Sequence, residues 1–138
     1  MSKELKKEAL GFARKYAASQ LVTVEGNKPC SRMMSTFKVE DDFTIWFATG
    51  VSSNKVRQIR KCPNVCVTFY DGTKEIYFYG RAKVLADSKT KRAMWHNEWK
   101  EYWPKGAEDP EYALIKVKAG KVLYRDMKAH GMEMKKII

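Results

Sequence analysis

The sequence predicts a mainly β protein, a small β-barrel of six or seven mostly antiparallel strands with two or three short flanking helices. Short apolar segments rich in β-branched and aromatic residues recur along the chain, and turn residues separate them. The connections are short, which favours an antiparallel barrel over an open parallel sheet. The sequence contains no repeated strand–helix–strand unit and no glycine-rich dinucleotide motif.

The first part of the chain is predicted to form a helix and then a pair of strands. Apolar residues recur at helical spacing over residues 3–17, with Lys and Glu on the other face, and Ser2 is a plausible N-cap. The spacing then changes to that of a strand over residues 21–24. A turn leads into a returning strand, which we expect over residues 29–37.

The most informative segment follows a dense apolar strand predicted over residues 43–48. The strand is followed by the polar segment Ser52-Ser53-Asn54-Lys55. A basic amphipathic helix is predicted next, over residues 56–61, and it ends at Cys62-Pro63. The start of a helix offers free backbone N–H groups and the positive end of the helix dipole, which favour an anion. With a Lys beside it, this helix start is predicted to be a phosphate site.

A further pair of strands is expected around a tight turn. Residues 65–70 form an apolar segment that Asp71-Gly72 closes, which is a strong hairpin signal. Residues 75–85 are predicted to be the long returning strand. Gly80 in the middle of that strand indicates a bulge or a close approach of two backbones.

The last part of the chain is predicted to contain a helix and a hairpin. Asp87-Ser88 is expected to cap a helix that runs to about Trp99. Residues 112–118 and 121–126 are expected to pair as a hairpin around Ala119-Gly120, and the tail after them has no clear period.

Length and composition favour one domain over residues 1–138, with 44% hydrophobic residues. The sequence shows no apolar run of membrane-spanning length and no apolar block near Met1, so we expect a cytoplasmic protein. Three cysteines without a CxxC pair agree with a reducing compartment. Their spacing from the two His residues does not favour a zinc site, and we expect no metal.

The net charge of +11 is compatible with nucleic-acid binding, but no nucleic-acid motif accompanies it. The basic residues are spread along the chain, so a basic soluble surface is the simpler interpretation. Such a surface would also concentrate anionic ligands, including phosphorylated cofactors.

Several short segments together resemble the pyridoxamine 5′-phosphate oxidase-like flavoproteins, and most closely their general stress protein 26 branch. The resemblance extends from about Gln20 to Tyr124. The segments that carry it, in order, are Ser31–Met34, Ile45–Thr49, Ser53–Val56, Asn64–Val67, Gly80–Ala82 and Glu108–Pro110.

This resemblance implies a split β-barrel that forms a homodimer and binds FMN in clefts at the subunit interface. It implies that Arg32 and Lys55 hold the flavin phosphate, which suits a group with close to two negative charges. The resemblance also implies hydroxyl and amide contacts from Thr49, Ser53 and Asn54. The backbone of Met33, Met34 and Ser35 would run along the edge of the flavin ring, and Phe47 and Ala48 would line the strand beside it.

Two departures from the oxidases themselves stand out. Glu75 falls where the oxidases carry a Gln that reaches the flavin of the partner subunit, and an acid there could repel a reduced, anionic flavin. The end of the chain, His130–Lys136, does not match the basic, aromatic-rich segment that grips the vitamin substrate. We therefore do not expect pyridoxal phosphate synthesis.

Each candidate also has a plainer interpretation. Arg32 could be a surface residue, Lys55 an ordinary first-turn cation, and Met33 and Met34 core filler. A cation at a helix N-terminus is slightly unfavourable, however, and a bound anion resolves that conflict. The aromatic residues near 95–103 are expected in the core or the dimer interface, with a substrate-pocket wall as the alternative.

The function expected from the sequence is an FMN-dependent oxidoreductase acting on a small molecule, with the redox chemistry supplied by the flavin. No residue stands out as a catalytic acid or base. One alternative is a non-catalytic carrier or sensor of the same fold that binds flavin, haem or a deazaflavin. Another is a basic nucleic-acid-binding barrel.

Overall fold

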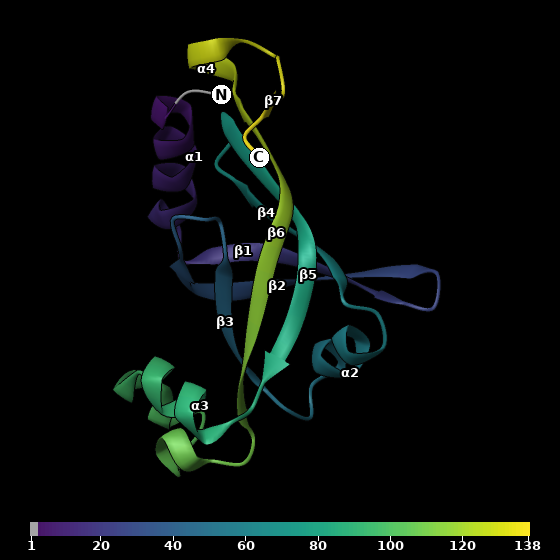
Figure 1. The fold of residues 1–138 in the computed structure, drawn as a ribbon, viewed down its shortest axis with the longest axis vertical. Helices are drawn as coiled ribbons and strands as arrows, with labels where there is room; N and C mark the ends of the chain where they lie inside the picture. Colours follow the sequence, from purple (N-terminus) through teal and green to yellow (C-terminus); the bar gives the residue numbers. More distant parts are fainter. Residues whose placement is uncertain (1–2) are drawn as a thin grey trace.

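The computed structural model describes residues 3–138, so the predicted N-cap Ser2 lies outside the described residues. Its strands form one antiparallel sheet in the order β3-β2-β1-β4-β5-β6-β7 (Figure 1). The strand bounds are β1 Ala18–Glu25, β2 Lys28–Val39, β3 Ile45–Gly50, β4 Asn64–Tyr70, β5 Lys74–Leu85, β6 Tyr112–Asp126 and β7 Lys135–Lys136.

The sheet closes on itself because β3 also pairs with β6, from Ile45 opposite Val117 to Gly50 opposite Tyr112. This pairing makes a barrel of the first six strands and leaves β7 as a short addition beside β6. The barrel with flanking helices confirms the predicted fold class. Alternate residues of the strands fill its interior, including Leu21, Phe47, Val67, Phe78 and Ile115, all with 0% exposure.

The helices lie at the two ends of the barrel and beside its opening. The α-helices are α1 Lys3–Lys15, α2 Asn54–Lys61, α3 Ser88–Met94 and α4 Met127–His130, and the 3-10 helices are Asn97–Glu101 and Gly106–Glu108. Figure 1 places α1 and α4 at one end of the molecule and α3 at the opposite end. None of the helices in residues 3–138 is long and apolar enough to cross a membrane.

The expected hairpin around Ala119-Gly120 is wrong, because residues 112–126 form the single strand β6. Gly80 lies opposite Ala119 and Tyr79 opposite Lys121, so Gly120 is an extra residue that bulges from β6. A Cβ atom on Gly80 would lie 2.2 Å from the Lys118 carbonyl oxygen. The predicted bulge and close backbone approach at Gly80 are therefore confirmed.

The expected helix from Asp87 to Trp99 is shorter than predicted. Asp87 caps it, accepting a hydrogen bond from the Thr90 N–H at 2.9 Å, but α3 ends at Met94 and Trp95 is extended. The break allows Trp95, Trp99 and Trp103 to surround Tyr112, with ring centroids 5.1, 5.9 and 5.2 Å away. Packing on this buried tyrosine overrides the local helical pattern.

Candidate functional site

A groove opens where β2 and β3 separate. The two strands pair from Thr36 opposite Phe47 to Val39 opposite Ile45, although both strands continue beyond the first of these pairs. Beyond it, Met33–Ser35 on β2 and Ala48–Gly50 on β3 diverge, and these segments line a cavity of about 640 Å³. The edge of β2 that would have paired with β3 faces this opening, so its backbone groups can bond a ligand.

Six of the ten sequence-predicted site residues line this groove. They are Met33, Met34, Ser35, Ala48, Thr49 and Lys55. Asn54 and Ser53 lie beside Lys55 at the start of α2, and Arg32 precedes the lining segment on β2. Phe47 differs, because its side chain is fully buried in the barrel core.

Arg32 is held in place by three oxygen atoms. It donates hydrogen bonds to the Leu21 carbonyl at 3.1 Å, the Thr23 hydroxyl at 2.8 Å and the Gln58 side-chain oxygen at 3.0 Å. All three acceptors are neutral, and no carboxylate of residues 3–138 forms an ion pair with Arg32. Its positive charge is therefore positioned but not neutralised.

Lys55 is the second uncompensated cation of the site. Burial of the side chain, and then the charge of Arg32, lower the pKa of Lys55 below its ordinary value. Lys55 also has no ion pair with any acid in the part of the chain that the structure describes. The positive charges of Arg32 and Lys55 repel one another, and neither has an acidic partner among the described residues. An anion bound beside them would relieve this repulsion and stabilise the site.

The start of α2 adds backbone donors to this site. Ser53 is the N-cap residue, but its side chain makes no capping bond, and its hydroxyl oxygen lies 3.4 Å from that of Thr49. The first turn of α2 contains no acidic residue. The N–H groups of this turn and the helix dipole therefore have no anionic side chain on their own helix to satisfy them.

The sequence interpretation missed three residues that shape the site. Thr23 and Gln58 position Arg32, and the Thr23 hydroxyl also donates to the Gln58 side-chain oxygen at 2.5 Å. Glu111 holds the loop before α2, accepting hydrogen bonds from the Ser52 N–H at 2.8 Å and hydroxyl at 2.7 Å. The sequence held one signal for these missed residues, which is the polar Gln58 on the apolar face of the helix, beside Val56 and Ile59.

An aromatic wall faces the strands across the groove. Trp99, Tyr102 and Trp103 line it, together with the exposed Glu98 and Glu101. Trp99 and Trp103 also belong to the cluster around Tyr112. The core interpretation of the aromatic segment therefore holds for these residues, and the same residues also line the cavity.

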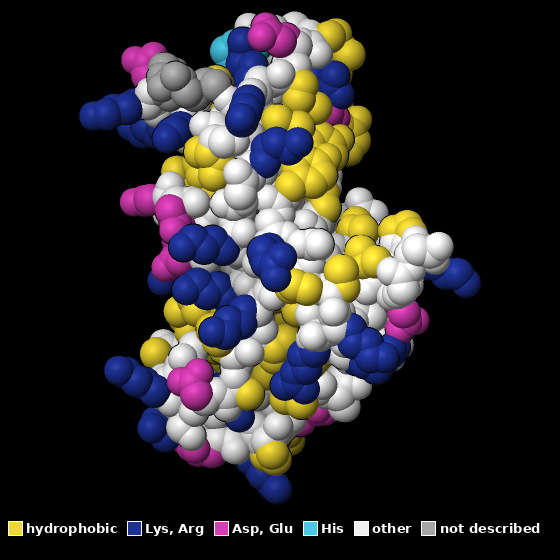
Figure 2. Space-filling view, turned by 45° about the vertical axis from the view of Figure 1, so that its right-hand side comes forward, with side chains coloured by type: hydrophobic (Ala, Val, Ile, Leu, Met, Phe, Trp, Pro, Cys, Tyr) yellow, Lys and Arg dark blue, Asp and Glu magenta, His cyan; other side chains and the backbone are white. Residues whose placement is uncertain are grey.

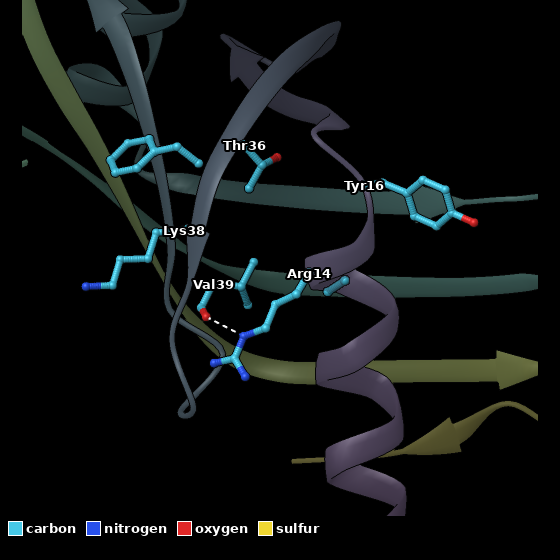
Figure 3. A pocket seen from close by; sticks show the side chains of 7 residues that line it. Arg14, Tyr16, Thr36, Lys38 and Val39 are labelled. Carbon is cyan, nitrogen blue, oxygen red and sulfur yellow. Dashed lines mark hydrogen bonds between the residues drawn. The ribbon is translucent and has the colours of Figure 1, made fainter. Parts of the chain in front are cut away.

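A second cavity, of about 300 Å³, lies between the end of α1 and β2 (Figure 3). Arg14 donates hydrogen bonds to the Val39 carbonyl and to Asp41, both at 2.8 Å, so its charge is already compensated. In Figure 3 the Lys38 side chain extends away from Arg14. This smaller cavity therefore lacks the paired free cations of the groove.

Glu75, the departure from the oxidases, has a partner of opposite charge. Its side chain is largely buried and forms an ion pair with Arg125, whose Nε lies 3.1 Å from a Glu75 oxygen. Arg125 also donates to the Met132 carbonyl at 3.1 Å. The acid is therefore neutralised within the chain and contributes to holding the C-terminal segment.

The antiparallel barrel of six strands with flanking helices is a split barrel, as in solved structures of the pyridoxinephosphate oxidase family. The family model described as pyridoxamine 5′-phosphate oxidase like matches residues 7–138. The chain belongs to this family.

Similar proteins carry the same fold or family name. General stress protein 26 of Bacillus subtilis is 28% identical over 121 residues, which are 83% of each chain. A Clostridium acetobutylicum protein related to general stress protein 26 superposes with a TM-score of 0.84 at 21% identity, covering 99% of this chain and 97% of that one. A pyridoxamine 5′-phosphate oxidase-related, FMN binding protein of Nostoc punctiforme superposes with a TM-score of 0.68 at 17% identity, covering 97% and 87%.

Proposed function

We propose that this protein binds FMN in the groove between β2 and β3 and serves as an oxidoreductase for a small molecule. The observation that carries the proposal is the pair Arg32 and Lys55, whose positive charges interact and which form no ion pair with an acid in residues 3–138, beside the start of α2. A phosphate group supplies the negative charge that this site lacks. A pyridoxamine 5′-phosphate oxidase-related, FMN binding protein of the same fold supports the choice of ligand.

The rest of the groove fits a flat aromatic ring system. The edge of β2 at Met33–Ser35 offers backbone groups for hydrogen bonds, and Met side chains offer adaptable apolar contact. The volume of about 640 Å³ lies in the range of ligand sites, and aromatic side chains form the opposite wall. Thr49 and Ser53 add hydroxyl groups between the ring end and the phosphate end.

We also propose that the chain forms a homodimer that covers the groove. An uncharged row crosses the outer face of the barrel in register, made of Met33, Gln20, Thr68, Tyr77 and Leu123. Met33 is 66% exposed and belongs both to this row and to the rim of the groove. A second copy placed on this face would bury the exposed apolar surface and narrow the opening above the ring.

When bound, FMN would supply the transfer of hydride or single electrons. The chain's own residues bind and orient it: Arg32 and Lys55 fix the phosphate end, and Met33–Ser35 hold the ring edge. Packing of Trp99 and Trp103 on Tyr112 makes the opposite wall rigid. A small substrate would enter between that wall and the exposed face of the ring.

The test is the double variant Arg32→Ala/Lys55→Ala, compared with Arg60→Ala/Lys61→Ala, which removes two exposed cations from the other end of α2. Affinity for FMN and for riboflavin is measured by quenching of flavin fluorescence. We expect the site variant to lose at least about 100-fold in FMN affinity, because two charge-assisted contacts contribute about 1.5–3 kcal/mol each.

The riboflavin arm separates phosphate binding from ring binding. The site variant should bind riboflavin as the wild type does, and the control should keep its preference for FMN. Circular dichroism checks the fold, and the single variant Lys55→Ala avoids disturbing the Arg32 hydrogen bonds. Unchanged FMN affinity in a folded double variant would rule out this site.

A further inference from the structure

The outer face of β5 and β6 carries pairs of like charge directly opposite one another. Lys83 lies opposite Lys116, and Arg81 lies opposite Lys118. Directly opposed residues of an antiparallel pair project from the same face, and like charges there are destabilising. A fold under selection for stability alone would place an acid in one of each pair, so this arrangement points to a use for the charge.

The charges continue on either side as a basic band, which we define as Lys38, Arg81, Lys83, Lys116, Lys118 and Lys121. Lys38 lies opposite Trp46, which in turn lies opposite Lys116, so the band crosses β2, β3, β6 and β5. Lys116 lies over the Trp46 ring at 5.3 Å, and Lys121 over the Tyr79 ring at 5.1 Å.

Few acids balance this band. Among the described residues, only Lys38 of the six forms an ion pair, with Glu40 at 3.8 Å. Asp42, at the edge near Lys118, is the other neighbouring acid, and the Lys118 charge contributes to its lowered pKa after the hydrogen bonds from Thr44. Figure 2 shows Lys and Arg side chains through the middle of this face, with acidic side chains mainly toward its margins.

The band is separate from the flavin groove, because none of its six residues lines that cavity. Strands in a sheet lie about 4.8 Å apart, so a band across four strands spans about 14 Å in that direction. A single phosphate would engage only one or two of these cations. An extended anion with several regularly spaced charges would engage most of them at once.

We infer that the basic band binds the sugar–phosphate backbone of nucleic acid without reading its sequence. The band offers charge complementarity to a polyanion, and the amide beside it, Asn64, lies opposite Arg81 and accepts a hydrogen bond from it at 3.4 Å, so its oxygen is already engaged. An anionic membrane is a poorer match, since Met33, Tyr70, Tyr102 and Met132 lie outside the band and the exposed ring beside it, Tyr79, lies under Lys121. An acidic protein would need apolar anchors, and the exposed ring beside the band, Tyr79, lies under Lys121.

The test uses the full chain and fluorescein-labelled 20-mers, one single-stranded and one duplex, with binding followed by anisotropy between 50 and 200 mM salt. The band variant is Arg81→Gln/Lys83→Gln/Lys118→Gln, which spares Lys116 because that side chain covers Trp46. The control is Lys3→Gln/Lys6→Gln/Lys7→Gln, which removes the same charge from exposed positions of α1.

We expect the band variant to bind at least tenfold more weakly and the slope of log affinity against log salt to fall by about 2 to 3. The control should keep most of the wild-type affinity and slope. Equal losses in both variants would overturn the proposal, since net charge alone would then explain binding. Binding to anionic lipid vesicles with none to either 20-mer would overturn it as well.

Discussion

At the scale of single residues, Lys55 in the lining of the groove and Arg32 beside that lining are held in different ways. Arg32 is fixed by three neutral oxygen atoms, and the Gln58 oxygen that accepts from it also accepts from Thr23. Lys55 is placed by the start of α2, and its side chain forms no hydrogen bond or ion pair with any of residues 3–138. Arg32 is thus a preset partner for two phosphate oxygens, and Lys55 is a point charge that can adjust.

The lowered pKa of Lys55 should give the proposed FMN binding a pH dependence. A phosphate favours the protonated form, so affinity should be highest while Lys55 is charged and should fall as pH rises through its pKa. That pKa lies below the ordinary lysine value, and a phosphate keeps its charge above pH 7. The fall should therefore begin at a lower pH than an unperturbed lysine would give.

Fluorescence titrations of FMN from pH 7 to pH 10 measure this effect, and Lys55→Arg is the matched variant. A guanidinium stays charged over the whole range, so the variant should lose most of the decline. A parallel decline in Lys55→Arg would show that another group titrates.

At the scale of elements, the bulge shared by β5 and β6 depends on Gly80 and not on the neighbouring Gly120. A Cβ atom on Gly80 would overlap the Lys118 carbonyl oxygen, at 2.2 Å, whereas one on Gly120 would meet its nearest atom at 3.9 Å. Because the clash is with backbone, the two strands would have to move apart.

Gly80→Ala should therefore lower the free energy of unfolding by about 1–3 kcal/mol, a cost typical of overpacking. Gly120→Ala should change it by much less and is the control from the same bulge. Urea denaturation followed by circular dichroism measures both. A Gly80→Ala protein as stable as its control would mean that the strands do not approach this closely.

Local signals in the sequence predicted most of these elements, and contacts between distant segments decided the rest. Alternating apolar residues, Asp71-Gly72 and the amphipathic pattern over residues 56–61 are local signals, and the structure follows them, with α2 starting two residues earlier at Asn54. Ala119-Gly120 has the composition of a turn but lies inside β6, because its pairing with β5 continues on both sides. The residues around Ala119-Gly120 do not by themselves indicate that this segment pairs with β5.

The candidate site divides in the same way. The Lys at a helix start and the Met segment are visible in the sequence, and the groove brings them together. Thr23, Gln58 and Glu111 act through bonds to residues 9, 26 and 59 positions away in the chain. Strand register and barrel closure determine these contacts, so no spacing rule could have found them.

At the scale of the whole molecule, the proposed dimer makes the uncharged outer row its buried centre. Thr68 is half-buried in the middle of this row, between Gln20 and Tyr77. Thr68→Arg should place an unpaired charge in the interface and convert the dimer to monomer. Analytical ultracentrifugation measures this, with Ala93→Arg on the exposed side of α3 as the control.

The same variant links assembly to the cofactor. If the second copy covers the groove, Thr68→Arg should weaken FMN binding although it lies outside the groove lining. The Ala93→Arg control should remain dimeric and bind as the wild type does. A wild-type protein that sediments as a monomer would contradict the proposed assembly.

Closure of the barrel has a consequence for the order in which the protein can mature. Residues 45–50 leave the ribosome well before residues 112–117, which complete the ring of strands. Until then β3 has one edge without a neighbour, and pairings this far apart in sequence form slowly, typically in milliseconds to seconds. The proposed groove between β2 and β3 is therefore complete only after residues 112–117 have been synthesised, and the nascent chain is most exposed to aggregation during that interval.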